Sequence, residues 1–189
     1  NDFVIRLSDR EVWLDFLNSE SIGEDSQESF LQTIDKLERQ NPEKTQKDLQ
    51  TLGTSLESVN NFINTNHEKS HFQNILDNLK ARGLSDFVKI DLNVVRGLAY
   101  YTGTVFEVFD SKKNMRAVAG GGRYDKLCSV ISDGATDIPA CGFAMGDVVI
   151  SDLIKSTKVA NSKLLNHLAV NDCADVYLVI ALSLIHISE

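Results

Sequence analysis

The spacing of apolar residues changes near residue 86, and this change limits the folds that the chain can adopt. Between residues 24 and 83, Leu, Ile and Phe recur three or four positions apart among Glu, Gln, Asn, Asp and Lys residues, as in amphipathic helices. From Asp86 onward, "FVKIDLNVV", "GTVFEVFD" and "MRAVAG" alternate or run apolar, as strands do. The chain is therefore expected to combine a helical segment with a sheet.

The order of these elements predicts an α+β fold. "DFVIRL" is expected to form a first strand, and Ser8, with Glu11 as its capping-box partner, is expected to begin the helix that contains "VWLDFL". After the later strands, "YDKLCSVIS" and "GDVVISDLI" have helical spacing, and "PACGFAM" between them is typical of a strand. Because strands follow one another before helices appear, we expect an antiparallel sheet with helices on one face.

The helical segment is expected to contain about three helices and to be an insertion, since it lies between the first strand and the rest of the sheet. One helix places Phe30, Ile34 and Leu37 on one face, a second extends over 49–63, and a third ends at Gly83. The chain then divides as follows: a first part of the main domain at 1–23, the insertion at 24–85, a second part of the main domain at 86–156, a polar linker at 157–173, a strand of a new domain at 174–181 and a tail at 182–189.

The tail, "LSLIHISE", resembles the translation of a common sequencing-library adapter. We therefore expect that it is not native and that the chain is a fragment. A genuine strand that continues to Ile187 is the alternative.

The composition excludes several classes of protein. Hydrophobic residues make up 42% and charged residues 24%, as in folded globular proteins, and no apolar run approaches the roughly 20 residues of a membrane helix. The net charge is −8, without the basic stripe of proteins that bind nucleic acid mainly through its phosphates. Three cysteines without CxxC spacing fit a reducing compartment. His67 and His71 have a possible metal spacing, but no third ligand is near, so a surface helix is the preferred interpretation.

The stretch "NVVRGLAYYTGTVFEVFD", residues 93–110, is the first candidate for chemistry. Arg96 is always charged and offers a planar fork of donors that suits carboxylate or phosphate oxygens. Gly97 permits a turn and the close approach of a ligand. Tyr100 and Tyr101 would point to opposite faces of a strand. From these residues alone, an ordinary hairpin and the wall of a pocket both remain open.

Two glycine-containing stretches are further candidates. "AVAGGGRYDKL", residues 117–127, has three consecutive glycines after a predicted strand; no Gly-Lys-Ser/Thr follows, so it is not a P-loop, and a flexible turn is the alternative to a ligand cradle. "IPACGFAMGDVV", residues 138–149, leads from a small-residue strand into a helix whose N-terminus could accept an anion.

Taken in order, "VRGLAYYTGTVFEVF", "GGGRYDKL" and "PACGFAMG" resemble the histidyl-tRNA synthetase family of class II aminoacyl-tRNA synthetases. The resemblance covers residues 86–155 and, less closely, the first strand. It implies a class II antiparallel sheet with flanking helices, an inserted helical domain at 24–85, and an anticodon-binding domain that begins with "ADVYLVIA" at 174–181.

The resemblance also implies roles for single residues. Arg96 would be the catalytic arginine that stabilises charge on the α-phosphate of ATP and would contact histidine as well. Tyr101, with Tyr100 beside it, would line the histidine pocket, and Tyr124 would add a hydroxyl; such groups suit an imidazole because they both donate and accept hydrogen bonds. Arg123 would be an ion partner. The implied glycines are Gly121 and Gly122 at the histidine site and Gly142 and Gly146 at the ATP site.

The chain departs from the family pattern at the end of the third class II motif. Family members commonly have Gly-x-Glu-Arg there, whereas this chain has Val148 and Val149 at the Glu and Arg positions. A valine cannot bind phosphate, so nucleotide binding is the part of the site that the resemblance supports least. Ala99 replaces a residue that is often acidic, which affects only local polarity.

The function implied by the resemblance is ATP-dependent attachment of histidine to tRNA(His) through histidyl-adenylate, with ATP used as its Mg²⁺ complex. The full-length protein would be a cytoplasmic homodimer that does not contact the membrane. The first two class II motifs would precede Asn1, so the 189-residue chain alone is expected to be inactive. One alternative is the regulatory subunit of ATP phosphoribosyltransferase, which shares "GGRYD". Another is a synthetase-like sensor domain of a stress kinase, which would need a kinase upstream.

Overall fold

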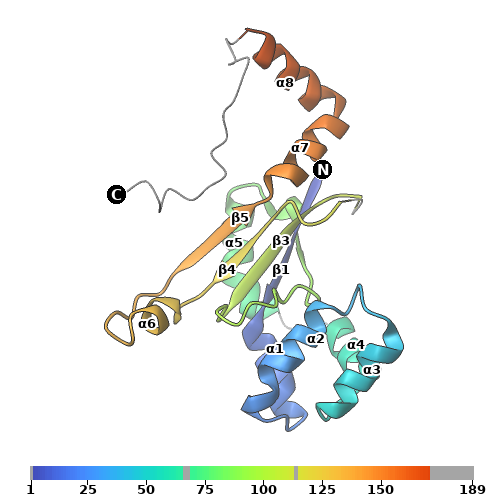
Figure 1. Cartoon of the computed structure of the whole chain (residues 1–189), viewed down its shortest axis with the longest axis vertical. Helices are drawn as coiled ribbons and strands as arrows, with labels where there is room; N and C mark the ends of the chain where they lie inside the picture. The colour runs from blue at the N-terminus through green and yellow to red at the C-terminus, as the bar shows by residue number, and fades with distance from the viewer. Residues whose placement is uncertain (1, 66–68, 113–114, 171–189) are drawn as a thin grey trace, which may run out of the picture. The chain divides into compact units, whose positions relative to one another are not determined.

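A mixed sheet of five strands forms the centre of the fold (Figure 1). The strands lie in the order β2-β1-β3-β4-β5, and their bounds are β1 Phe3–Asp9, β2 Val88–Ile90, β3 Thr104–Asp110, β4 Ala119–Arg123 and β5 Cys141–Met145. The predicted α+β class is confirmed. The sheet is not purely antiparallel, however, because β2 pairs with β1 in parallel while the other three pairs are antiparallel. A parallel pair needs a long crossover, and the helical segment between β1 and β2 supplies it.

The structure, a computed structural model, describes residues 2–65, 69–112 and 115–170. The chain divides into two compact units, Asn1–Ile150 and Ser151–Glu189. All five strands lie in the first unit, and so does the helical segment at 24–85 that the sequence marks as an insertion.

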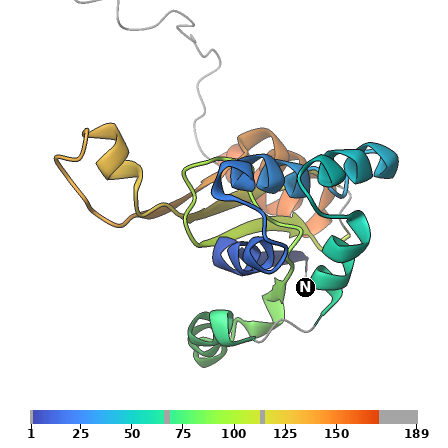
Figure 2. The ribbon, with the colours of Figure 1, turned by 90° about the horizontal axis from the view of Figure 1, so that it is seen from below.

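Helices and short 3₁₀ turns account for most of the remaining described residues. Their bounds are α1 Arg10–Ser19, η1 Glu24–Ser26, α2 Gln27–Asp35, α3 Pro42–Thr51, α4 Leu56–Asn64, η2 Lys69–Phe72, α5 Gln73–Ala81, η3 Ser85–Phe87, α6 Leu127–Ile131, α7 Asp147–Ser156 and α8 Lys158–Val170. Helices α1 to α4 gather beyond one end of β1 and β3, whereas α6 lies at the far end of the β4–β5 connection (Figures 1 and 2).

Two predicted helix boundaries are wrong. The N-cap of α1 is Asp9, whose carboxylate accepts from the Glu11 N–H at 2.9 Å, and Ser8 is the buried last-but-one residue of β1. The helix predicted over 49–63 is two helices, because Gly53 adopts a φ of 91° after α3 and Ser55 then caps α4 by accepting from the Ser58 N–H. The apolar residues keep their helical spacing across this break, so the sequence pattern does not indicate it.

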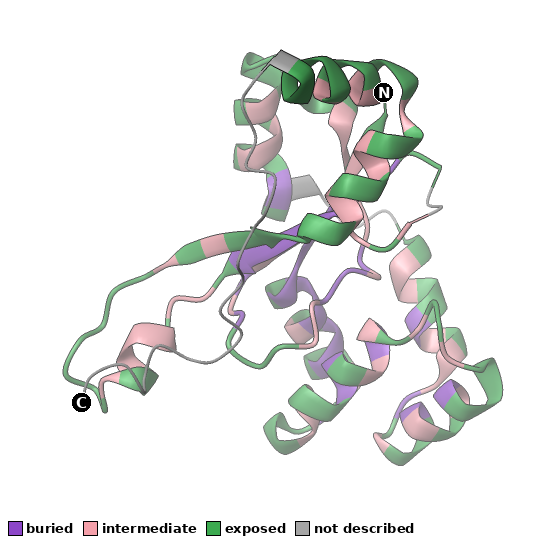
Figure 3. Cartoon of the chain, turned by 45° about the horizontal axis from the view of Figure 1, so that its top comes forward, coloured by how far each residue is buried: buried purple, intermediate pink, exposed green. Residues whose placement is uncertain are grey.

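Buried residues lie both in the strands and in the helices (Figure 3), and those of the helical segment and the sheet belong to one hydrophobic core. Trp13 on α1 is fully buried and its ring lies 5.6 Å from that of Phe30 on α2. The same cluster takes in Leu49, Val59 and Phe72 from the helical segment, Leu7 from β1, and Leu92 and Val95 from the connection between β2 and β3. The apolar stripes of the predicted insertion are therefore core, as the sequence indicates.

The segment after β5 differs from the sequence prediction. Helix α7 is confirmed, but residues 158–170, predicted as part of a polar linker, form helix α8. The predicted strand at 174–181 and the tail at 182–189 lie outside the described residues.

Candidate active site

The connection between β2 and β3 carries the motif "RGLAYY" as a loop and not as part of a strand hairpin. Arg96 within it has a φ of 54°, a left-handed conformation that a non-glycine residue rarely adopts. The Leu98 N–H donates to the Arg96 carbonyl at 2.6 Å, which closes a tight turn around Gly97. Backbone of this kind persists only where the surroundings hold it in place.

Arg10, the first residue of α1, holds this loop. Its guanidinium donates to four carbonyl oxygens of the loop, those of Val95, Arg96, Leu98 and Tyr101, at distances of 3.2, 2.6, 2.7 and 2.9 Å respectively. Arg10 is only 6% exposed, and this burial lowers its pKa below the ordinary arginine value. A buried guanidinium that binds four carbonyls fixes the path of the backbone from Val95 to Tyr101.

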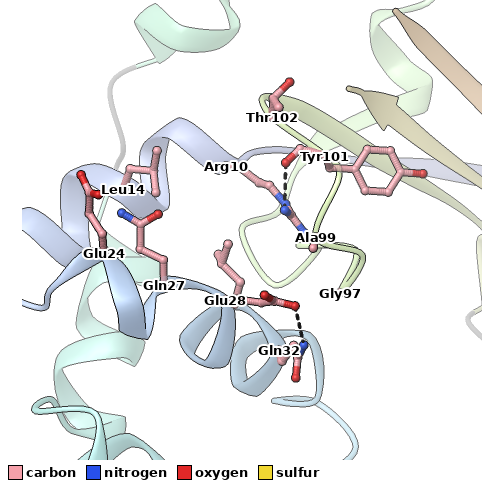
Figure 4. A pocket seen from close by; sticks show the side chains of 11 residues that line it. Arg10, Leu14, Glu24, Gln27, Glu28, Gln32, Gly97, Ala99, Tyr101 and Thr102 are labelled. Atoms are coloured by element: carbon pink, nitrogen blue, oxygen red, sulfur yellow. Dashed lines mark hydrogen bonds between the residues drawn. The ribbon is translucent and has the colours of Figure 1, made fainter. Parts of the chain in front are cut away.

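The loop has two sides, and only one of them carries the predicted site. On one side is a cavity of about 340 Å³ lined by Arg10, Leu14 and Gln27, among others (Figure 4). The Tyr101 carbonyl faces Arg10 there, but the Tyr101 ring points the other way (Figure 4). The predicted aromatic and glycine residues therefore lie on the side to which the Tyr101 ring points.

On that side, Arg96 forms an ion pair with Glu107 of β3, in which Nη1 lies 2.9 Å from Oε1. Burial disfavours the charged guanidinium, but the hydrogen bond and charge of Glu107 outweigh this and raise the Arg96 pKa above its ordinary value. The side chain retains 23% of its exposure. Arg96 is thus a fixed and permanently charged cation that a ligand can still reach.

The glycine triplet is part of strand β4 and not a flexible turn after it. A side chain at Gly120 would collide with the Arg96 guanidinium, and one at Gly122 would come within 2.8 Å of the Tyr101 ring. Gly142 on β5 pairs with Gly122, and a side chain there would collide with the Tyr124 hydroxyl. Three glycines on one face therefore form a bare floor on which Arg96, Tyr101 and Tyr124 lie.

The three predicted tyrosines form one cluster. Ring centroids are 4.6 Å apart for Tyr100 and Tyr101, 5.7 Å for Tyr100 and Tyr124, and 6.2 Å for Tyr101 and Tyr124. Tyr100 and Tyr101 do not point to opposite faces, because they belong to a loop and not to a strand. Tyr101 is 6% and Tyr100 38% exposed, and the hydrogen bond with Tyr101 raises the pKa of Tyr100.

The remaining predicted residues lie at the edge of this group or outside it. Gly121 would direct a side chain to the other face of the sheet, against Phe143, so it can take part only through its backbone. The Gly146 N–H donates to the Val118 carbonyl at 2.9 Å, at the start of α7. Arg123 is an ion partner of Asp125 at 2.7 Å and is the last residue of β4.

Two cavities lie beside the Arg96–Glu107 pair. One, of about 320 Å³, is lined by Arg96, Gly97 and Leu98. The other, of about 420 Å³, is lined by Val94, Arg116 and Val149, among others. Both include Asp35, Arg39 and Glu107 in their walls, so they are neighbouring parts of one polar cleft.

Sequence reasoning missed Arg10, Asp35 and Glu107. Asp35 at the end of α2 accepts the Gly97 N–H at 3.1 Å, and its side chain packs 3.4 Å from the position a Gly97 side chain would take. Glu107 could have been suspected, because it is the one charged residue within the strand "TVFEVF". Arg10 and Asp35 carried no local signal, since both lie on exposed-looking helical patterns far from the loop in sequence.

The described part of the chain contains neither a group of side chains that could hold a metal ion nor a helix that could cross a membrane. There, no three His, Cys, Asp or Glu side chains are grouped so as to hold a metal ion. His67, one of the pair with metal spacing, lies outside that part, and His71 is placed 3.7 Å from Asp15. No helix among residues 2–65, 69–112 and 115–170 is both long enough and apolar enough to cross a membrane.

The mixed sheet of five strands with flanking helices has the fold of class II aminoacyl-tRNA synthetases. The sequence model described as "Histidyl-tRNA synthetase" matches residues 15–147. The chain belongs to the histidyl-tRNA synthetase family.

Individual relatives agree with this membership. The chain is 38% identical over 177 residues to a histidine–tRNA ligase of Opitutus terrae, covering 81% of this chain and 40% of that protein. It is 34% identical to a chloroplastic/mitochondrial histidine–tRNA ligase of Arabidopsis thaliana, covering 82% of this chain and 35% of that protein. The crystal structure of histidyl-tRNA synthetase from Nostoc sp. PCC 7120 aligns with a TM-score of 0.60 at 25% identity, over 90% of this chain and 44% of that one.

The chain thus spans about 40% or less of the length of these curated relatives. A Bacillus halodurans structure titled as an ATP phosphoribosyltransferase regulatory subunit/histidyl-tRNA synthetase also aligns, with a TM-score of 0.60 over 92% of this chain and 56% of that one. At 20% identity it supports the fold alone.

Proposed function

We propose that the full-length protein attaches histidine to tRNA(His) in two steps, through histidyl-adenylate, with ATP as its Mg²⁺ complex. The observation that carries this proposal is the Arg96 guanidinium, paired with Glu107 and lying over Gly120 beside the tyrosine cluster. Relatives that the chain matches at 34–38% identity are named histidine–tRNA ligases.

Arg96 would act on the α-phosphate of ATP. When the histidine carboxylate attacks that phosphorus atom, negative charge develops on its oxygens, and a fixed cation stabilises this charge more than it stabilises the substrates. Arg10 holds the Arg96 backbone through its carbonyl, and Glu107 pairs with the Arg96 side chain. Together they leave the Arg96 guanidinium little freedom to move. Arg96 would therefore need little reorganisation when the reaction occurs.

Tyr101 and Tyr124 would recognise the substrate histidine. Their hydroxyls both donate and accept, which matches an imidazole with one donor and one acceptor nitrogen. Because Gly122 and Gly142 have no side chains, the Tyr101 ring and the Tyr124 hydroxyl can lie close against β4 and β5. Tyr100, which is more exposed, would close the outer side of this pocket, and Gly121 would contribute backbone alone.

The regulatory subunit of ATP phosphoribosyltransferase is the second candidate, because the "GGRYD" of this chain is a motif that the regulatory subunit shares. The pair Arg96–Glu107 favours the enzyme, since a protein that only senses histidine needs no fixed cation that a phosphate group could reach. We further propose a cytoplasmic homodimer for the full-length protein, following the family resemblance.

Histidine-dependent exchange of pyrophosphate into ATP by the full-length protein tests the proposal. Wild-type protein is expected to catalyse the exchange, and Arg96→Ala is expected to lower kcat by about 10³-fold, within the range attributed to preorganised charge stabilisation. The Michaelis constant for histidine should rise much less. An unchanged kcat with a raised histidine Michaelis constant would instead give Arg96 a binding role only. Binding of histidine without any exchange would favour the regulatory subunit.

A further inference from the structure

We propose that Arg116 binds the outer phosphates of ATP. Arg116 would supply the positive charge that position 149, which is a valine in this chain, does not supply. The inference deepens the proposed function and rests on it for the identity of the ligand. It concerns the cavity of about 420 Å³ beside Glu107, which Arg116 lines from the connection between β3 and β4 and Val149 lines from α7.

The arginines that line this cavity are not equally available. Arg6 is 3% exposed and fully engaged, with hydrogen bonds of 2.9 and 2.8 Å to the two Glu38 oxygens and 2.7 Å to Asp91. Arg39 pairs with Asp35 four residues before it. Arg116 is exposed, and within the described part of the chain its side chain has no hydrogen bond or ion pair. It is the lining cation that is available to an incoming ligand.

The acidic side chains of the cavity do not neutralise Arg116, since each already binds another group. Asp35 accepts from the Gly97 N–H and from Arg39, Glu38 binds Arg6, and Glu107 binds Arg96. The lining itself has three arginines and three carboxylates, but Glu107 is paired with Arg96 of the adjoining cavity, so Arg116 is left without an acidic partner. An exposed guanidinium over a polar cavity binds an anion with bidentate geometry, and phosphate oxygens match its fork of donors.

The position of the cavity indicates which phosphates Arg116 would reach. It shares Asp35, Arg39 and Glu107 with the cavity that Arg96 lines. If Arg96 binds the α-phosphate, a chain of further phosphates can extend past Glu107 into the adjoining cavity and meet Arg116. Val149 lines that cavity but offers no donor, so α7 supplies no cation there. The two observations are complementary: the unpaired arginine and the apolar residue face the same cavity.

Calorimetric binding of ATP, AMP and adenosine to the full-length protein tests this assignment. Arg116→Ala is expected to raise the Kd of ATP by about tenfold or more, the loss expected for a charge-assisted hydrogen bond. The Kd values of AMP and adenosine should stay within about twofold of wild type, because they lack the outer phosphates. Arg82→Ala, which removes an exposed arginine at the end of α5 that lines none of the described cavities near Arg96, is the matched control.

A rescue variant separates a direct contact from a structural effect. Arg116→Ala combined with Val149→Arg is expected to recover most of the ATP affinity, since the new arginine would reach the same cavity from α7. In pyrophosphate exchange, Arg116→Ala should raise the Michaelis constant for ATP and leave that for histidine unchanged.

Three results would overturn the inference: equal ATP affinity in wild type and Arg116→Ala, equal weakening of ATP and adenosine, or no ATP binding by wild type. These results are distinct from failure of the proposed function, which would appear as ATP binding without histidine-dependent exchange. In that case the comparison of ATP with adenosine still decides whether Arg116 binds the outer phosphates.

Discussion

At the scale of single residues, the site depends on which side chains are missing as much as on which are present. Arg96 can lie flat against β4 only because position 120 has no side chain, and the Tyr124 hydroxyl can approach β5 only because position 142 has none. From the sequence, the glycine triplet could be either a ligand cradle or a flexible turn. It forms a strand whose alternate positions serve different faces.

Because of this alternation, adding a side chain at one glycine should affect activity, whereas adding one at the neighbouring glycine should affect stability. Gly120→Ala should push the Arg96 guanidinium out of its place beside Glu107 and lower the exchange rate by at least about tenfold, with stability nearly unchanged, because misplacing a group proposed to act in catalysis costs that much or more. Gly121→Ala should instead destabilise the protein by about 1–3 kcal/mol, since its new methyl group would meet the backbone of Gly142. Thermal unfolding and pyrophosphate exchange measured on both variants distinguish the two effects.

Gly23→Ala is the control for these substitutions, because a methyl group there meets nothing within 4 Å. If Gly120→Ala and Gly121→Ala lost stability and activity in the same proportion, the assignment of the two positions to opposite faces would be contradicted.

At the scale of elements, the loop between β2 and β3 is held at both ends. Asp91 begins it and accepts from Arg6 of β1 at 2.7 Å and from the Asn93 side-chain amide at 2.8 Å. Arg10 binds its later carbonyls, and the Thr102 N–H donates to the Arg123 carbonyl at 2.9 Å, which joins its end to β4. The strained Arg96 backbone therefore lies between three fixed points on β1, α1 and β4.

The pairing of Asp91 with Arg6 makes the free energy of unfolding depend on pH in the acid range. Burial would raise the pKa of Asp91, but the hydrogen bonds and charge of Arg6 outweigh it and hold the pKa below its ordinary value of 3.8. The contribution of the carboxylate is thus fully present above pH 3.8 and is lost as the pH falls through the lower pKa of the folded state. Asp91→Asn should cost about 3 kcal/mol at pH 7, because it leaves buried Arg6 with fewer charged partners.

Urea unfolding of wild type and Asp91→Asn between pH 7 and pH 2 measures this dependence. The difference in the free energy of unfolding should be constant at neutral pH and shrink below pH 3.8. Asp25→Asn, on an exposed residue of η1, is the control. A difference that stayed constant down to pH 2 would show that the Asp91 charge contributes nothing to stability.

At the scale of the whole first unit, the helical segment and the sheet are expected to unfold together, because one core joins them. Phe30 is fully buried at the centre of this core, with its ring 5.6 Å from those of Trp13 and Phe16. The position of 24–85 as an insertion in the chain does not make it independent in folding. Its helices provide part of the wall beneath the Arg96 loop, through Asp35.

Phe30→Ala should destabilise the unit by about 3–5 kcal/mol, the usual cost of a cavity of this size in a core. Hydrogen exchange followed by mass spectrometry should show peptides of α2 to α4 and of β1 and β3 losing protection together. Leu84→Ala, at a residue 42% exposed, should have little effect on either region. Loss of protection confined to the helices would show that they form a separate folding unit.

The sequence by itself determined the class of the fold and the chemical types in the site, because both depend on local information. The change in apolar period separates helices from strands, and Arg96, the tyrosines and the glycines each have properties that hold in any surroundings. It also predicted that α-helical stripes over 24–83 would be core, which the buried cluster confirms.

Tertiary structure alone decided the pairing and the direction of these groups. Local patterns do not indicate that β2 returns parallel to β1, that Arg10 reaches across about 90 positions to hold a loop, or that Tyr100 and Tyr101 lie on one side. The break at Gly53 is of the same kind, since it depends on a backbone angle that an apolar stripe does not record. Contacts between distant residues are set by packing of the whole unit, and it is packing that brought Arg116 and Val149 to one cavity.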